Sequence, residues 1–314
     1  MGVLSAIPKL SVTQVMKRYK VGLSLGVGAY LTWGLFPLYW PLLEPAHSIE
    51  IVAHRAVWTF VVCFALLLYS GKLRSTVALL RDRPTVLRLL ASTILISINW
   101  LVYIWGVNSG HIVECALGYY INPLLIIAFG VFLLKERMRK LQWASVLIAS
   151  IGVIVLAIDY GRPPWIALAL ATSWGSYGLV KKQLGLGALE GLAIETALSF
   201  IPYAAYLLWL AQKGTGQFGH HIGLSVLLAL AGVVTAIPLL MFNASTNRLK
   251  FTIIGLLQYI TPTVQFLIGV LVRHEAMTTG RWIGFIIVWV ALFALGYDLV
   301  KSGSSSDNSF AEFD

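Results

Sequence analysis

Residues 108–143, NSGHIVECALGYYINPLLIIAFGVFLLKERMRKLQW, recur 139 positions later as residues 247–282, NRLKFTIIGLLQYITPTVQFLIGVLVRHEAMTTGRW. Ten of the 36 aligned positions are identical without a gap, which is more than shared apolar composition readily produces. At an offset of 141, Trp33-Gly34 also falls on Trp174-Gly175, and His54-Arg55 falls on Glu195-Thr196. A repeat of this length predicts a chain built from two similar halves.

The composition indicates that the chain does not fold in water. Of its 314 residues, 58% are hydrophobic and only 11% are charged, and the mean hydropathy is +0.82. A soluble domain carries roughly 25% charged residues. Disordered proteins and nucleic-acid-binding modules need still more charge, so both classes are excluded. We therefore expect an integral membrane protein.

Ten stretches are apolar and close to the roughly 20 residues that a helix needs to cross a bilayer. They are residues 21–43, 49–69, 86–107, 113–134, 143–158, 164–180, 192–211, 224–242, 253–272 and 282–299. Each half then holds five spans, and an odd number makes the second half enter the membrane from the opposite side. The predicted fold is an all-α integral membrane protein with ten transmembrane helices in two inverted five-helix repeats.

The distribution of Lys and Arg predicts the orientation. With the N-terminus inside, inner segments hold 18 of the 23 cations and outer segments hold four, with Arg55 left within a span. Such a bias places both termini in the cytoplasm. We expect a cytoplasmic segment at 1–20 without a signal peptide, one repeat at 21–159, a second at 160–301, and a disordered cytoplasmic tail at 302–314.

Several long motifs resemble those of a known family. They are GAYLTWGLFPLYW (28–40), AHRAVW (53–58), INWLVYIWGVNSGHIVECALGYYINPL (98–124), LKERMRKLQW (134–143) and GLLQYITPT (255–263). Together they resemble the RarD permeases of the EamA branch of the drug/metabolite transporter superfamily, over about residues 20–301. The resemblance implies ten helices in two EamA repeats in a bacterial inner membrane. The family name is tied to chloramphenicol sensitivity, but the resemblance implies no natural substrate and no site residue.

Inverted-repeat transporters bind substrate near the midplane, often where equivalent helices are interrupted. Pro123 and Pro262 occupy equivalent positions in the middle of the fourth and ninth spans, where each should kink its helix. Polar side chains flank both prolines: Tyr120, Asn122, Gln258, Tyr259 and Thr261. These residues predict a binding site, although bends that serve packing alone remain the alternative.

A polar face and several aromatic residues complete the predicted site. Gln258, Thr261 and Gln265 fall on one face of the ninth span, which should point at protein or at a wet cavity. Mid-span aromatic residues beside hydrogen-bonding groups suit stacking on an organic substrate, with plain packing as the alternative. The remaining predicted binding residues are Trp33, Asn99, Trp100, Trp174 and Tyr177.

Charged residues within spans are rare and functional by default. His54, Arg55 and Glu195 are therefore candidates for charge pairing or ion coupling, and Glu195 is a possible partner for Arg55. A purely structural ion pair is the alternative. Glu114 lies at the edge of its span, where it can simply reach the headgroups.

The sequence lacks the motifs of other functional classes. There is no GxxxxGK[ST], HExxH or GxSxG, and Cys63 and Cys115 have neither disulfide nor metal-ligand spacing. We expect no catalytic residue, metal or cofactor, and a secondary transporter that moves a small organic metabolite or drug-like molecule by alternating access. A lipid or glycolipid flippase and a membrane-embedded transferase are the alternatives. Expected partners are the substrate and membrane lipids, but no nucleic acid; a homodimer, the direction of transport and proton coupling stay open.

Overall fold

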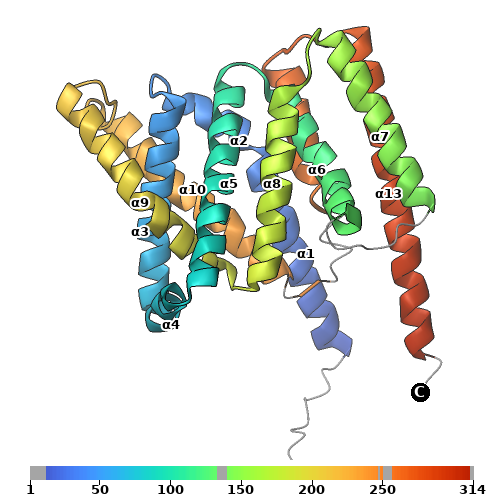
Figure 1. Ribbon diagram of the computed structural model, residues 1–314, viewed down its shortest axis with the longest axis horizontal. Helices are drawn as coiled ribbons and strands as arrows, with labels where there is room; N and C mark the ends of the chain where they lie inside the picture. Colours follow the sequence, from blue (N-terminus) through green and yellow to red (C-terminus); the bar gives the residue numbers. More distant parts are fainter. Residues whose placement is uncertain (1–11, 133–139, 247, 250–256, 312–314) are drawn as a thin grey trace, which may run out of the picture.

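The computed structural model describes residues 12–132, 140–246, 248–249 and 257–311, and these ranges contain helices and no strand (Figure 1). The helices, with short 3₁₀ or π segments marked η, are α1 (Val12–Gly34), α2 (Phe36–Tyr39), η1 (Trp40–Leu43), α3 (Ser48–Tyr69), α4 (Leu73–Ala78), η2 (Leu79–Arg81), α5 (Arg83–Asn108), α6 (Ile112–Phe132), α7 (Lys140–Asp159), α8 (Trp165–Leu184), α9 (Ala188–Lys213), α10 (Ile222–Thr246), α12 (Ile260–Leu267), η3 (Ile268–Val272) and α13 (Thr279–Ala311).

Six described helices are long and apolar enough to cross a membrane, namely α3, α5, α7, α9, α10 and α13. A seventh span results if residues 16–34 of α1 and the α2–η1 segment count as one, because the two are bent by 41° at Leu35. The break has a local cause, since Pro37 and Pro41 open the two short helices at positions where proline fits without losing a hydrogen bond.

Successive long helices run in opposite directions along one bundle. In Figure 1 the described start of α1 and the end of α13 lie at the same end, as do α4 and the turn between α8 and α9. Gly185 and Gly214 end α8 and α9 with φ of 62° and 64°, a left-handed conformation that glycine adopts without strain. These turns reverse the direction of the chain.

Equivalent helices of the two halves pack against one another. α7 lies along α13, α3 along α9 and α6 along α12, while α1 packs on α10 as α5 packs on α8 (Figure 1). The helices can be numbered from the first helix of each half. The second helices are then α3 and α9, the fourth are α6 and α12, and the fifth are α7 and α13. The α1–α10 contact joins the first helix of one half to the third of the other, and so does the α8–α5 contact.

Glycines allow the closest of these approaches. Any Cβ on Gly232 of α10 would fall on the backbone of Trp58 and Thr59 in α3. Gly152 of α7 and Gly284 of α13 face each other, and a Cβ on Gly152 would come within 3.0 Å of the Gly284 carbonyl oxygen. Small residues at crossing points are typical of membrane helices, which gain stability from tight packing because lipid gives little hydrophobic drive for association.

The interior and exterior of the bundle are both apolar. One buried cluster includes Trp40, Ile104 and Leu228, and a second includes Leu117, Phe266 and Phe285. Large apolar side chains also cover the outside; Phe293 is 80% exposed and Ile201 75%. Exposed apolar surface on this scale marks contact with lipid.

Two segments differ from the sequence-based expectation. The ninth span is not one helix, because a turn at Gln258 and Tyr259 precedes α12, and residues 253–256 lie outside the described part. Pro262 is the third residue of α12, where its missing N–H has no intrahelical partner to lose, so it sits beyond the break instead of kinking a helix. The predicted disorder from 302 is wrong up to Ala311, since α13 continues there; adding residues to an existing helix is easier than nucleating one.

Candidate functional site

Arg55 lies two turns into α3 with only 5% of its surface exposed. Its guanidinium carbon is 4.1 Å from the ring centroid of Trp100, 5.0 Å from that of Trp40 and 5.6 Å from that of Phe36. Cations are attracted to the faces of aromatic rings by about 0.5–2 kcal/mol, depending on how far they are desolvated. Three aromatic residues from α2, η1 and α5 therefore form a cage around a buried cation.

The cage does not neutralise Arg55. Its Nε donates a 2.9 Å hydrogen bond to Thr235 Oγ1 of α10, and no carboxylate in the described part of the chain forms an ion pair with it. Glu50, the nearest carboxylate along α3, instead accepts a hydrogen bond from the Gln217 backbone. An Arg at the centre of a spanning helix costs roughly 2.5–3.5 kcal/mol on insertion scales. The fold therefore keeps a costly, uncompensated charge in its interior.

Gln265 joins α12 to the first half beside this cage. Its Nε2 donates to the Tyr103 hydroxyl at 2.8 Å and to the Trp33 carbonyl at 3.3 Å, and its Oε1 is buried without a partner. Thr261, one turn earlier, donates to the Tyr30 carbonyl at 2.8 Å. Thr261 and Gln265 thus share a buried face that packs on α1. Gln258 lies in the preceding turn, so the three residues predicted to share one helical face do not share one helix.

Asn99, which precedes the cage residue Trp100, joins α5 to α8. Its Nδ2 donates to Ser173 Oγ at 3.0 Å and to the Leu170 carbonyl at 3.2 Å. Tyr119 donates to Asn99 Oδ1 at 3.4 Å, and its ring is 5.7 Å from that of Tyr103. Both tyrosines lie within electrostatic range of the Arg55 guanidinium.

These residues form one group at the interface of the two halves, which we name the central cluster. Its first-half members are Phe36, Trp40, Arg55, Asn99, Trp100, Tyr103 and Tyr119, and its second-half members are Ser173, Thr235 and Gln265. Within the central cluster, three hydrogen bonds between side chains join the two halves: Arg55–Thr235, Asn99–Ser173 and Tyr103–Gln265.

Glu195 belongs to a different group. Its Oε1 accepts from Ser92 at 2.7 Å and from Lys181 Nζ at 3.0 Å, and its Oε2 accepts from Tyr177 at 3.1 Å. The predicted partnership of Glu195 with Arg55 is therefore wrong. Lys181 satisfies the carboxylate because the short turn between α8 and α9 brings the two side chains together.

The remaining predicted residues are placed as follows. Tyr120 bonds Thr263 at 2.9 Å and packs near Phe285 and Trp289, on the side of α6 away from the central cluster. Trp174 packs between Tyr119 and Tyr177, and Trp33 against Tyr30 and Phe242. His54 is buried and stacks on Phe218, and both its ring nitrogens lack partners. Asn122 is buried, Tyr259 is half-buried in its turn, and α6 runs on through Pro123.

The predicted headgroup position of Glu114 also differs from the structure. Glu114 is 1% exposed, pairs with Arg162 at 2.9 Å and accepts a hydrogen bond from the Ile166 backbone N–H at 3.0 Å. It therefore ties the start of α6 to the start of α8. No group of three or more potential metal ligands occurs among the described residues.

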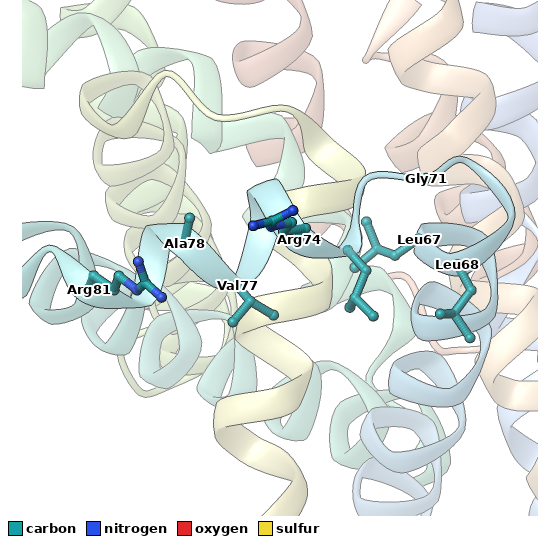
Figure 2. Close-up of a pocket in the computed structure, with 8 residues that line it drawn as sticks. Leu67, Leu68, Gly71, Arg74, Val77, Ala78 and Arg81 are labelled. Atoms are coloured by element: carbon teal, nitrogen blue, oxygen red, sulfur yellow. The ribbon is translucent and has the colours of Figure 1, made fainter.

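Figure 2 shows a pocket of about 590 Å³ at the corner between α3 and α4. Leu67, Leu68 and Val77 line it together with Arg74 and Arg81. The pocket contains none of the predicted binding residues and lies away from the central cluster, at the end of the bundle where the charged α4 segment sits.

Sequence reasoning missed Phe36, Trp40, Tyr103, Tyr119 and Thr235. Phe36 and Trp40 lie in a motif quoted above, but only the break at Leu35 turns them toward Arg55. Tyr119 and Tyr120 are adjacent, and a uniformly apolar helix offers no periodicity that tells which one faces the other half.

Comparison with known proteins agrees with this architecture. The sequence profile of the EamA-like transporter family matches residues 20–158 and again residues 163–297. "Protein RarD" of Streptomyces exfoliatus is 49% identical over 289 residues, covering 91% of each chain, and "Protein RarD" of Escherichia coli K12 is 37% identical over 286 residues, covering 90% of this chain and 96% of that one. An "Uncharacterized transporter" of Vibrio cholerae is 40% identical over 288 residues, covering 91% and 95%.

One solved crystal structure of a protein aligns with a TM-score of 0.58 at 19% identity, covering 88% of this chain and 97% of the other, which shows a shared fold alone. The sequence matches confirm the resemblance seen in the motifs. These matches cover most of the chain, and together with the apolar helices they are sufficient to assign the family. The chain belongs to the EamA-like transporter family, as a multi-pass membrane protein of the RarD type.

Proposed function

We propose that the chain is a secondary transporter that moves a small organic metabolite or drug-like molecule across a bacterial inner membrane by alternating access. The observation that carries the proposal is the central cluster, in which three side-chain hydrogen bonds join opposite halves within the spans. Polar and charged groups are costly at this depth and are typical of substrate pathways in membrane proteins. The chain carries no ATP-binding loop of the GxxxxGK[ST] kind, so the proposed mechanism uses no ATP.

The proposed architecture has ten spans in two inverted repeats, 21–159 and 160–301. The repeated family match, the internal sequence repeat and the packing of α7 on α13 and of α3 on α9 support it. In inverted repeats, a site at the interface opens to one side when one half tilts against the other. Each crossing hydrogen bond would then break and re-form as the halves move.

The proposed orientation has both termini in the cytoplasm. The bundle end that carries α4 and the α8–α9 turn holds many cations, including Lys72, Arg74, Arg81 and Lys181. Basic loops favour the cytoplasmic side. The central cluster offers hydrogen bonds and aromatic faces but no nucleophile paired with a base, which favours binding over catalysis.

Reconstitution into proteoliposomes tests the proposal. Vesicles containing the protein are incubated with a mixture of bacterial small metabolites, with and without a proton gradient, and their contents are measured by mass spectrometry. We expect at least one compound to accumulate or be lost faster than in protein-free vesicles, at a rate that saturates with concentration. Identical contents in the two vesicle types would refute transport, and chemical conversion of a compound would indicate an enzyme.

A further inference from the structure

The central cluster leaves hydrogen-bond donors without acceptors. Within the described part of the chain, the two terminal guanidinium nitrogens of Arg55 have no hydrogen-bond partner, and the residue keeps 5% of its surface exposed. Trp40, which forms one wall of the cage, is fully buried with an unpartnered Nε1. Guanidinium and indole N–H groups donate and never accept. The cage thus presents a surplus of donors together with a positive charge.

No anion of the protein occupies this position. Glu195, the carboxylate predicted to approach Arg55, is held by Lys181, Ser92 and Tyr177, and Glu50 accepts from the Gln217 backbone. Among the described residues, no acidic side chain is paired with Arg55. Its polar neighbours are Thr235 and the tyrosines Tyr39, Tyr103 and Tyr119. Arg55 therefore has no counter-ion among the described residues.

We propose that the central cluster binds an organic anion, with the carboxylate, phosphonate or sulfonate group of the ligand on the terminal nitrogens of Arg55 and its apolar body against the surrounding aromatic residues. The Arg fork matches the two oxygens of such a group. The cage rings Trp40, Trp100 and Phe36 hold the guanidinium in place by covering it, so little side-chain freedom is lost on binding. This inference rests on the proposed function, since it names the class of the transported substrate.

The first measurement is binding to the purified full-length protein in a neutral detergent. Thermal unfolding is followed while benzenesulfonate, benzoate or phenylphosphonate is added, and benzamide and benzyltrimethylammonium serve as neutral and cationic compounds with the same ring. We expect the anions to raise the unfolding midpoint saturably and the other two to leave it unchanged. Equal responses to all five compounds, or no response to any anion, would overturn the proposal.

Variants then locate the anion. Arg55→Gln should raise the half-saturating anion concentration at least about tenfold, the size of one lost charge-assisted hydrogen bond. Arg74→Gln removes an exposed cation at the α3–α4 corner and should leave it unchanged. Because Arg55→Gln also removes the bond to Thr235, Arg55→Lys is measured beside it; it keeps the charge without the fork, so weaker binding with the anion preference retained is expected. Wild-type anion binding in Arg55→Gln would place the anion elsewhere and refute the site.

Two further measurements are added. The first distinguishes a soluble anion from a lipid headgroup, and the second distinguishes failure of the anion proposal from failure of the transporter proposal. Phosphatidylglycerol is added to the micelles in place of the soluble anions; a midpoint shift from the lipid alone would make the ligand a headgroup and contradict a soluble substrate. In proteoliposomes, transport of only neutral or cationic compounds that Arg55→Gln leaves intact would refute the anion class while the transporter stands. Arg55-dependent anion binding without transport would instead refute the transporter and leave the anion site.

Discussion

The ion pair between Lys181 and Glu195 should respond very unequally to removal of its two partners. Glu195 is 1% exposed, whereas the side chain of Lys181 is 20% exposed at the basic end of the bundle. In Lys181→Met the carboxylate stays buried with only Ser92 and Tyr177 as donors. In Glu195→Gln the Lys181 ammonium group loses its charged partner, but the long Lys side chain can extend to water or headgroups.

Magnitudes follow from this asymmetry. Stranding one partner of a buried pair costs about 3–5 kcal/mol, so Lys181→Met should lower the free energy of unfolding by an amount near that range. Glu195→Gln keeps the shape, and its amide oxygen can still accept a hydrogen bond, so the loss is about that of one charge-assisted hydrogen bond, roughly 1.5–3 kcal/mol. The double variant should be less destabilised than the sum of the single ones, with a coupling free energy of about 1–3 kcal/mol.

The assay is unfolding in mixed micelles by titration with sodium dodecyl sulfate, followed by tryptophan fluorescence. The matched control is Lys72→Met, which breaks the pair with Glu190 at the same end of the bundle; Lys72 is 52% exposed, so about 0–1 kcal/mol is expected. Additive single effects, or a larger loss for Glu195→Gln than for Lys181→Met, would refute the account of a buried carboxylate that depends on Lys181.

Two other outcomes are expected. Gly232→Ala should destabilise the protein by about 1–3 kcal/mol in the same unfolding assay, because the new Cβ would overlap the α3 backbone at Trp58. The Cβ of Gly178→Ala would meet no atom within 4 Å, so this variant should be neutral or stabilise α8 by about 0.5–1 kcal/mol. Equal effects at both positions would contradict the close approach of α3 and α10. Cysteines placed singly in the 213–220 loop should react with an impermeant thiol reagent from outside, and those at Arg81 or Lys140 should not; the reverse labelling would overturn the orientation.

The helices and the repeat could be predicted because both leave signals that extend over many residues of the sequence. Apolar runs near 20 residues determine where helices cross a membrane, and the aligned motifs around Pro123 and Pro262 exposed the repeat. The break at Leu35 and the turn at Gln258 were missed, since a continuous apolar run hides an interruption. Pro262 indicated the neighbourhood of that turn but not its position, because proline fits best just after a helix start.

Part of the central cluster could be anticipated from the sequence, whereas its role in binding stays a prediction. Arg55, Asn99, Trp100 and Gln265 were identified because polar or aromatic groups stand out within apolar spans, and all four lie in the central cluster. Their partners could not be predicted, because contacts between helices depend on rotation about each helix axis, and an apolar helix in lipid has no polar face that fixes it. Glu195 shows the limit most clearly. Its alignment in the repeat with His54, the neighbour of Arg55, suggested that it pairs with Arg55, whereas the nearby turn supplies Lys181 as its partner.

The most direct test of alternating access is the accessibility of Ser173, a 5% exposed member of the central cluster whose hydroxyl accepts from Asn99 across the interface. Ser173→Cys changes one atom, and it is made in a background where the native cysteines Cys63 and Cys115 are replaced by alanine. In sealed vesicles of known orientation, a membrane-impermeant methanethiosulfonate reagent is added to one side or the other. Alternating access predicts labelling from each side in separate experiments, with protection by a transported compound. Labelling from neither side, or from one side only under all conditions, would contradict it.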